Sequence, residues 1–536
     1  MTLMQILIFV VFASLVALLR RGPGRIPDVR RSNLIRWLLL AGSVLAIYWM
    51  QPPMPVRYLD FWLPTATLGL AVLVWAATRS GHEIHERRET REKRENNEER
   101  ETGEKMSLRE PDVFSGSKQS IGWGLLRRLR QFAMTVHLNM GENGLVAIFL
   151  AGIVLLVGLA RYLPDAACCL TPTRPPDLWK IIAAVGIIGL AAYGLAKGSS
   201  SRRSIPQLAT LLLIGVFVVL KTEPLAQAAA AGLRALSGQS TRLASALDIR
   251  WLGFSYVAFR LIHTLRDRLA GRLPALSLSE FVTYIIFFPA FTAGPIDRVQ
   301  HFTQDLRKLE PLGIPSGGQR ILLGIFKKFA LADSLALIAL NAAHIDQVKS
   351  GLWLWVLLYA YALRIYFDFS GYTDIAIGLG KLMGFNLPEN FERPYLKSNL
   401  TAFWNSWHIT LAQWFRAYFF NPLTRAMRSV KRKYPLWLVV LSGQLGTMLL
   451  IGLWHGITWN FAAWGLWHGV GLFVHSRWSE ATRARLVPLA ARPRLQRAFS
   501  GIGTLLTFHY VVLGWVWFAL PSMELSWKAL VKLFAG

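Results

Sequence analysis

Cysteine is almost absent from this sequence. The only two cysteines, Cys168 and Cys169, are neighbours, so no disulfide framework can form within the chain apart from a strained vicinal bond. Cysteine therefore offers no metal site either. The first apolar run, residues 3–19, lacks a basic leader and a small-residue cleavage site, which argues against a processed signal peptide.

Charged residues are also scarce. They make up 17% of the 536 residues, whereas hydrophobic residues make up 53%. A soluble domain would carry about 25% charged residues, so this composition excludes the soluble class and predicts a polytopic membrane protein. Six early apolar runs approach the roughly 20 residues that a transmembrane helix needs: 3–19, 34–50, 61–77, 145–160, 181–195 and 208–220.

The spanning elements are expected to be helices. Lipid offers the backbone no hydrogen-bond partners, and the alternating pattern of a membrane barrel is missing. The sequence therefore predicts an all-α fold with roughly 11–13 transmembrane helices, plus re-entrant or interfacial helices.

Acidic residues are outnumbered, 31 against 59 basic residues, which gives a net charge of +28. In a soluble chain this excess would suggest nucleic acid. Here the basic residues cluster at 20–31, 79–130 and 197–203, after apolar runs. The positive-inside rule places these segments in the cytoplasm and the loops 51–60 and 161–180 outside. The charge therefore predicts topology and a membrane partner, with no nucleic acid.

Composition divides the chain into five segments. Residues 1–78 hold the first transmembrane helices, and residues 79–125 form a charged cytoplasmic linker that is too polar to build a core. Membrane helices resume over 126–250. Motifs concentrate in 251–480, and 481–536 contain a loop and a final transmembrane helix.

The spelling Gly-Leu-Trp-His-Gly occurs twice, ending at Gly456 and at Gly469. In the first copy, glycines leave room around His455 and Trp454 supplies an apolar wall. A neutral imidazole in this setting can take a proton from a hydroxyl that attacks an acyl carbonyl. A hydrogen bond between helices is the competing role for such a histidine.

The second copy contains His468, thirteen residues after His455. On one uninterrupted helix this offset is about 220°, so the two rings would point to different sides. A packing role is therefore expected for His468. Histidines could bind zinc, but no close His-x-x-x-His or His-x-x-Glu pair supports a site, and metal is predicted absent.

Another Trp-His pair, Trp407 and His408, lies in an aromatic stretch from 399 to 421. Helical spacing places Trp404 and His408 on one face and Trp407 on another. Such a helix could line a cavity, or it could lie in the interface with its aromatic rings at headgroup level.

Two carboxylates, Asp368 and Asp374, flank a Ser-Gly-Tyr sequence that ends at Tyr372. Their cost in a membrane implies partners or water. They are expected to pair with Arg364, Lys381 or a site histidine, or to mark a helix break. Upstream, a pair of lysines at 327 and 328 is expected to snorkel and fix orientation at the cytoplasmic surface.

The motifs follow one another in a specific order between residues 251 and 475. The blocks are WLGFSYVAFRLIHTLRDRL, FVTYIIFFPAFTAGPIDR, GIFKKFALAD, YFDFSGYTDIAIGLGKLMGFNLPENFERPYLKSNLTAFWNSWHITLAQWFRAYFFNPL and GLWHGITWNFAAWGLWHGV. This succession resembles the membrane-bound O-acyltransferase (MBOAT) superfamily, in particular the bacterial branch that D-alanylates teichoic acids or O-acetylates alginate and cellulose. The resemblance covers roughly half of the chain and is more specific than any lone motif. The N-terminal part, with its charged insertion, departs from that branch.

The resemblance implies a funnel-shaped MBOAT core over 251–480 and assigns roles to residues. His455 matches the family's catalytic histidine, and His408 matches the second conserved histidine, which would orient or polarise a substrate. The residues expected to contact or support substrates are Trp404, Trp407, Trp454, Asp368, Tyr372 and Asp374.

The implied reaction transfers an acyl group, acetyl by analogy, from a cytoplasmic thioester to a hydroxyl of an exported polysaccharide. The thioester, acetyl-CoA or an acyl carrier protein, is a co-substrate, and no bound cofactor is expected. The expected partners are the membrane, the polysaccharide acceptor, an extracytoplasmic SGNH-type or DltD-like protein, and a cytoplasmic acyl carrier. The expected location is the inner membrane of a bacterial cell, with multiple passes.

Other functions stay open on the sequence alone. A D-alanyl or lipid acyltransferase of the same superfamily would share these motifs. A polytopic transporter or channel would also carry intramembrane Asp and His residues, but it would usually show inverted repeats or paired broken helices. A scaffold with an inactive site is disfavoured by the intact histidines.

Overall fold

The computed structural model describes residues 1–21, 28–78, 141–163, 170–198, 203–308, 313–429, 434–490 and 492–535. The linker predicted over 79–125 and the two cysteines lie outside this set. The described chain is helical, with one isolated bridge between Phe391 and Trp407 and no strand. The expectation of an all-α protein is confirmed.

The first half of the chain contains these helices: α1 (Leu3–Arg21), α2 (Asp28–Met50), α3 (Leu59–Thr78), an unlabelled helix ending in η1 (Ala160–Tyr162), α6 (Leu178–Gly198), α7 (Ser204–Lys221), α8 (Glu223–Leu236), α9 (Phe254–Leu269), α10 (Leu278–Ile286) and α11 (Val299–Lys308).

The second half contains α12 (Ile314–Ile325), the π-helical η6 (Phe326–Ala332), α13 (Asp333–Ala336), α14 (Ala342–Gln347), α15 (Gly351–Leu382), α16 (Leu400–Trp404), α17 (Ile409–Phe415), the π-helical η8 (Arg416–Phe420), α18 (Asn421–Ser429), α19 (Leu436–His455), α20 (Trp459–Ala490), α21 (Pro493–Ala519) and α22 (Met523–Ala535).

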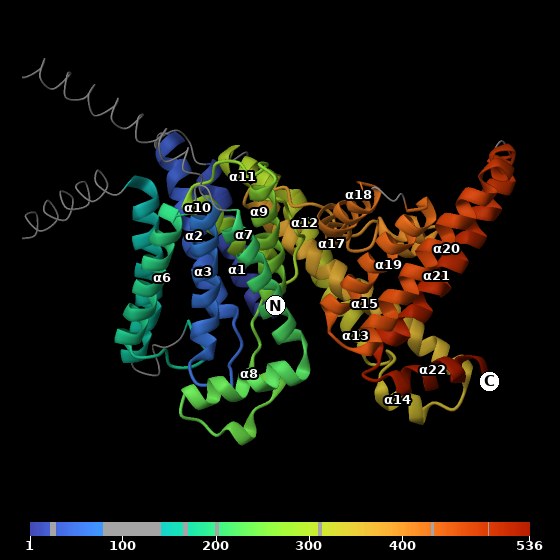
Figure 1. The fold of residues 1–536 in the computed structure, drawn as a ribbon, viewed down its shortest axis with the longest axis horizontal. Helices are drawn as coiled ribbons and strands as arrows, with labels where there is room; N and C mark the ends of the chain where they lie inside the picture. Colours follow the sequence, from blue (N-terminus) through green and yellow to red (C-terminus); the bar gives the residue numbers. More distant parts are fainter. Residues whose placement is uncertain are drawn as a thin grey trace, which may run out of the picture.

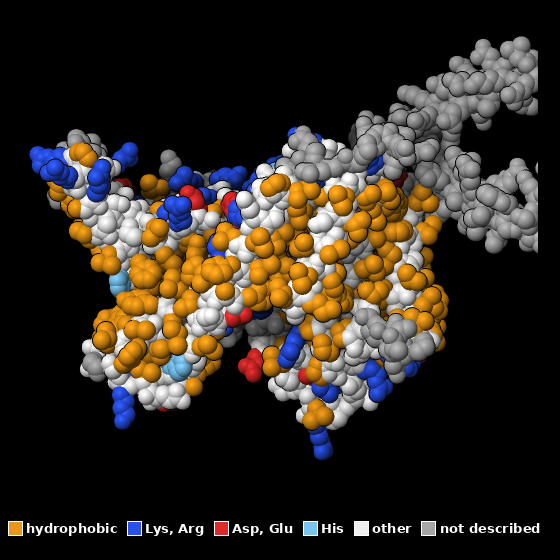
Figure 2. Space-filling model, turned by 180° about the vertical axis from the view of Figure 1, so that it is seen from behind, with side chains coloured by type: hydrophobic (Ala, Val, Ile, Leu, Met, Phe, Trp, Pro, Cys, Tyr) orange, Lys and Arg blue, Asp and Glu red, His pale blue; other side chains and the backbone are white. Residues whose placement is uncertain are grey.

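Nine helices of the described chain are long and apolar enough to cross a membrane: α1, α2, α3, the helix over 141–162, α6, α7, α15, α19 and α21. Others, such as α9 and α12, are too short to cross alone. Hydrophobic side chains cover the middle of the molecule, and basic side chains gather toward its two ends (Figure 2). This is the surface of a multi-pass membrane protein.

The helices form two groups with α12 and α15 between them (Figure 1). The first group contains α1 to α10, and the second contains α19 to α21. Helices α8, α14 and α22 lie at one end of the molecule, while α11 and α18 lie at the other. The charged linker leaves α3 and returns at residue 141, so the positive-inside rule assigns the end with α11 and α18 to the cytoplasm.

Glycines allow α12 and α15 to pack closely. A Cβ atom at Gly324 would lie 2.6 Å from the carbonyl oxygen of Gly371, and one at Gly371 would lie 2.8 Å from that of Gly324. Small residues of this kind let membrane helices approach backbone to backbone. Beyond α12 the chain becomes π-helical in η6, an irregularity that is frequent at functional sites.

The close packing of α12 and α15 determines which side chains pair with the motif carboxylates Asp368 and Asp374. Lys327 and Arg320 both pair with Asp374, at 2.7 and 2.6 Å, and Lys328 pairs with Asp368. The prediction that the two lysines snorkel to the cytoplasmic surface is wrong, because both ammonium groups turn to carboxylates of α15. The carboxylates take no partner from their own helix, and α15 continues unbroken through both positions.

The two Gly-Leu-Trp-His-Gly copies lie on different helices. The first ends α19, and the second lies within α20, after a break at residues 456–458. A Cβ atom at Gly452 would overlap the carbonyl oxygen of Phe461, so this glycine is required where the two helices meet. The premise of one uninterrupted helix is therefore wrong, and the motif marks a helical hairpin.

Candidate active site

His455 is the last residue of α19 and is half-buried. Its ring contacts those of Trp454, Phe518, Trp464 and Phe461, with centroids 4.5, 4.8, 5.6 and 5.9 Å away. Aromatic rings from α19, α20 and α21 thus enclose the imidazole while leaving part of it accessible. This is the setting that a general base shielded from bulk water requires.

His408 contacts the same indole as His455. The Trp454 centroid is 6.1 Å from the His408 ring and 4.5 Å from that of His455. His408 is 4% exposed, and its ring packs against Phe369 of α15 at 4.6 Å. Two histidines that are 47 positions apart in the sequence therefore share Trp454 as a neighbour.

The position of the His408 side chain is set by the break between helices α16 and α17, not by one face of a continuous helix. Helix α16 ends at Trp404, and His408 adopts a left-handed conformation (φ 44°, ψ 53°) before α17 begins. Asn390 fixes this start, since its carbonyl oxygens accept hydrogen bonds from the amides of Ile409 (3.0 Å) and Thr410 (3.2 Å). The continuous helix expected over 399–421 is wrong, because the chain turns in order to bury His408.

Several buried polar atoms at this site have no hydrogen-bond partner among the described residues. They are both ring nitrogens of His408 and of His468 and the indole nitrogens of Trp404, Trp454 and Trp464. Unpaired buried donors are rare and call for an explanation. A substrate whose oxygen or sulfur atoms bind here would satisfy those groups that face it.

An apolar cavity of about 440 Å³ runs up to Trp454. It is bounded by α7, α9, α17, η8 and α19, and its lining residues are Thr210, Ile214, Phe217, Val218, Ser255, Ala258, Phe259, Ile262, Arg266, Trp414, Phe415, Tyr418, Phe419, Leu450, Leu453, Trp454 and Ile457. A basic cavity of about 490 Å³ shares Arg266 and Tyr418 with it and adds Arg203, Arg272 and Arg425. The two cavities together lead from arginines at the end of the molecule near α18 to the indole beside His455.

The other predicted site residues fall into two groups. Trp404 contacts Trp464 at 5.7 Å, and Trp464 in turn contacts His455, so Trp404 belongs to the site's surroundings. Trp407 is 5% exposed and packs against Trp515 at 5.1 Å, as a core residue does. Tyr372 shares a hydrogen bond with Thr292, which ties α15 to the segment before α11.

The carboxylates differ in exposure. Asp374 is buried between two cations, whereas the side chain of Asp368 is 52% exposed despite its contact with Lys328. Asp374 therefore holds α15 against α12, and only Asp368 is accessible to a solute.

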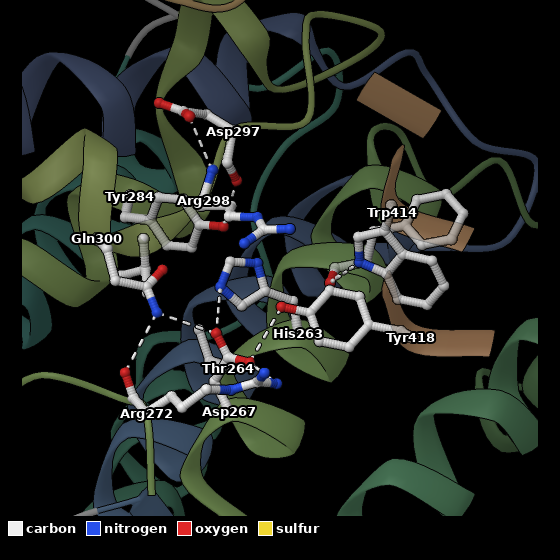
Figure 3. Close-up of polar contacts among 12 residues, drawn as sticks. His263, Thr264, Asp267, Arg272, Tyr284, Asp297, Arg298, Gln300, Trp414 and Tyr418 are labelled. Carbon is white, nitrogen blue, oxygen red and sulfur yellow. Dashed lines mark hydrogen bonds and ion pairs between the residues drawn. The ribbon is translucent and has the colours of Figure 1, made fainter. Parts of the chain in front are cut away.

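Sequence reasoning missed a polar cluster around Asp267 on α9 (Figure 3). The carboxylate accepts hydrogen bonds from Arg272 (3.0 Å), Gln300 (3.0 Å) and Tyr418 (3.1 Å). His263 lies one turn earlier, with its Nε2 3.6 Å from Asp267, and stacks on Tyr418. The i, i+4 spacing of His263 and Asp267 was the available signal. The cluster positions Tyr418, which lines both cavities.

A second ion pair, between Asp297 and His301, lies near this cluster. The two residues flank the start of α11, with His301 Nδ1 2.9 Å from a carboxylate oxygen. This hydrogen bond raises the pKa of His301. Within the described ranges no three His, Cys, Asp or Glu residues are placed to hold a metal ion.

His468 is fully buried and touches the same indole as His455. Its ring lies 5.1 Å from both Trp464 and Trp404, so the two histidines do not point to unrelated sides as the helical offset predicted. The reason is the hairpin, which folds α20 back along α19. His468 is 0% exposed whereas His455 is partly accessible, which keeps packing as the expected role of His468.

His468→Ala should therefore retain catalysis while losing stability. We expect turnover per folded molecule within about threefold of wild type, and a loss of about 2–4 kcal/mol in unfolding free energy from the cavity left behind. Activity normalised to monodisperse protein, with the thermal midpoint measured in parallel, tests both parts. A turnover as low as that of His455→Ala, in protein that remains folded, would show that the wrong histidine was assigned to packing.

The sequence model of the MBOAT family, membrane-bound O-acyltransferases, matches residues 186–516. This is more than half of the chain and contains both histidines that contact Trp454. The protein therefore belongs to the membrane-bound O-acyltransferase family, and the resemblance found in the sequence is confirmed.

Curated relatives come from three groups. The chain is 35% identical to the probable alginate O-acetylase AlgI of Azotobacter vinelandii over 290 residues, 53% of this chain and 54% of that protein. It is 28% identical to the teichoic acid D-alanyltransferase of Streptococcus thermophilus over 350 residues, 62% of this chain and 80% of that protein. It is 33% identical to the peptidoglycan O-acetyltransferase of Helicobacter pylori over 282 residues, 50% of each chain. The chain spans about half the length of the alginate O-acetylases that it matches.

Proposed function

We propose that this protein transfers an acyl group, acetyl in the first instance, from a cytoplasmic thioester to a hydroxyl of an exported polysaccharide or of a relay partner. The observation that carries the proposal is the position of His455, accessible within an aromatic enclosure beside the end of an apolar cavity. Relatives named as O-acetylases and O-acetyltransferases support acetyl as the acyl group.

The chemistry begins with His455 as general base. The acceptor hydroxyl attacks the thioester carbonyl carbon, and the imidazole takes the hydroxyl proton as the new C–O bond forms. The tetrahedral intermediate then collapses, the C–S bond breaks, and the imidazolium returns its proton to the leaving thiolate. The products are an ester and a free thiol, and no covalent acyl-enzyme is needed.

His408 has a supporting part in this scheme. Its unpartnered ring nitrogens and its place beside Trp454 suit a group that orients the acceptor or polarises the thioester. The rigid start of α17 holds the ring in one position, which favours orientation over proton shuttling.

The two substrates would approach from opposite sides. The arginine-lined cavity beside Tyr418 suits a negatively charged thioester, either acetyl-CoA or the phosphopantetheine arm of a carrier protein. The acceptor would come from the end with α8 and α22, where we place an SGNH-type or DltD-like partner. The inner membrane of a bacterium is the matching location.

Analysis of the exported polymer tests this function. Mild alkali releases ester-linked groups, so acetate and D-alanine are measured in polymer from cells with the gene intact and deleted. Acetate that disappears in the deletion supports the proposal. D-alanine in its place would support the activity named for the Streptococcus relative, and polymer with the same esters in both strains would overturn both.

A further inference from the structure

Lys221, the last residue of α7, contacts the backbone of His455. Its ammonium donates a hydrogen bond to the carbonyl oxygen of His455 at 3.4 Å, and its own carbonyl accepts one from the amide of Ile457 at 3.3 Å. The two bonds join the end of α7 to the break between α19 and α20. A positive charge is thereby held next to the proposed base.

Several lysines of the described residues pair with a carboxylate, namely Lys180, Lys327, Lys328, Lys397 and Lys528. Among the described residues Lys221 has no carboxylate within ion-pair distance, and Lys532 is similar, since its ammonium donates to the carbonyl oxygen of Ile345. Lys221 differs from Lys532 in its place, because it ends an apolar span beside the proposed base. An ammonium that is partly shielded from water without a counter-charge is costly, so this one calls for a functional reason.

Topology does not supply that reason. Basic residues near the cytoplasmic end of α7, such as Arg203, follow the positive-inside rule, but Lys221 lies at the opposite end of this helix. A snorkelling lysine would extend to the headgroups. Lys221 turns instead toward the backbone of α19.

The contact between Lys221 and His455 borders the apolar cavity. Phe217 and Val218 from α7, and Trp454 and Ile457 on either side of His455, all line that cavity. A thioester carbonyl at this end would meet an apolar wall in which hydrogen-bond donors are few. The ammonium of Lys221 and the unpartnered indole nitrogen of Trp454 are hydrogen-bond donors beside His455.

We propose that the ammonium of Lys221 stabilises the oxyanion of the tetrahedral intermediate, as a further catalytic residue of the reaction proposed above, on which this inference rests. When the acceptor oxygen attacks, the carbonyl π electrons move to the oxygen while His455 holds the proton. Lys221 remains protonated throughout and donates a hydrogen bond to that oxygen. When the C–S bond breaks the charge passes to sulfur, which takes the proton from His455.

The competing role for Lys221 is a helix cap. Cations near a helix C-terminus satisfy its last carbonyl groups, and the bond to the His455 carbonyl has this form. A cap acts on the stability of the fold, whereas an ammonium that faces the oxyanion adds Coulombic stabilisation of the transition state, which a neutral amide donor supplies less well. Glutamine and arginine separate the two roles, because both side chains can donate to the carbonyl and only arginine is cationic.

The experiment uses the full-length protein in lipid nanodiscs, acetyl-CoA as donor, and unesterified polymer from the deletion strain as acceptor, with thiol release as the readout. We expect Lys221→Gln to lower kcat by about 10²–10³-fold with KM for acetyl-CoA within threefold. Lys221→Arg should stay within about tenfold of wild type. Lys197→Met, at the end of the neighbouring helix α6, is the matched control and should leave the rate unchanged.

Equal rates for Lys221→Gln and Lys221→Arg would overturn the inference and favour a helix cap. A change in KM for acetyl-CoA with kcat unaffected would overturn it as well. Binding of CoA, which lacks the reacting carbonyl, provides a check on folding and should be unchanged in Lys221→Gln. His455→Ala in the same assay separates the two proposals. If that variant is inactive while Lys221→Gln is fully active, only the role of Lys221 fails, and if His455→Ala is active the proposed mechanism fails first.

Discussion

His455→Ala should lower acyl transfer by about 10³-fold or more. A positioned general base contributes about 10²–10⁴-fold, and His455 is the partly accessible imidazole within the aromatic enclosure of Trp454, Trp464 and Phe518. His468 also contacts Trp464 but is fully buried, so it does not replace His455 as an accessible base. The measurement is ester content of the exported polymer per molecule of protein in the membrane, followed by turnover of purified protein.

His344→Ala provides the matched control for this variant. His344 belongs to α14, is half-buried, and bonds only to the carbonyl of Ala339, so its loss should leave ester content unchanged. Unchanged ester in cells with His455→Ala, at normal protein abundance, would remove His455 as the base.

Asp374→Ala should cause the largest loss of stability among the motif variants. The carboxylate is 4% exposed and is bonded to both Arg320 and Lys327. Its removal leaves Lys327 without a carboxylate partner, whereas Arg320 keeps Glu389. Breaking a buried ionic group in this way costs about 3–5 kcal/mol. The thermal midpoint in detergent and the yield of monodisperse protein measure the effect.

Asp346→Ala is the corresponding surface control. Asp346 pairs with Lys528 at 2.6 Å, but both side chains are more than half exposed. Exposed pairs of this kind contribute little, so no shift in midpoint is expected. Midpoints that fall equally in the two variants would show that the Asp374 cluster does not hold α15 to α12.

The sequence contained the family, the helical class and the identity of the two principal histidines. These depend on local spelling and composition, and the family match confirms the first two. The partners of Asp374 and Lys328 could not be derived, because they depend on how closely α12 and α15 approach. That approach follows from single glycines such as Gly324 and Gly371, whose effect is tertiary.

The helix breaks next to the histidines could not be predicted from the sequence either. Helical spacing predicts one helix through 399–421 and one from His455 to His468, but the helix is interrupted before α17 and again after α19. No glycine or proline marks the break at His408, since Asn390 creates it from eighteen positions upstream. Lys221 directly follows the apolar run 208–220, and its contact with His455 could not be predicted because it joins positions 234 residues apart.

The left-handed backbone conformation of His408 lowers the folding stability, and a glycine at this position would avoid that loss. Glycine adopts this conformation without penalty, whereas a residue with a side chain there gives up roughly 1–3 kcal/mol. A protein selected for stability alone would place glycine between Trp407 and Ile409. This chain keeps an imidazole with unpaired nitrogens in a buried, strained position beside Trp454, and under the proposed function folding free energy is exchanged for activity at a residue outside the helix that carries the base.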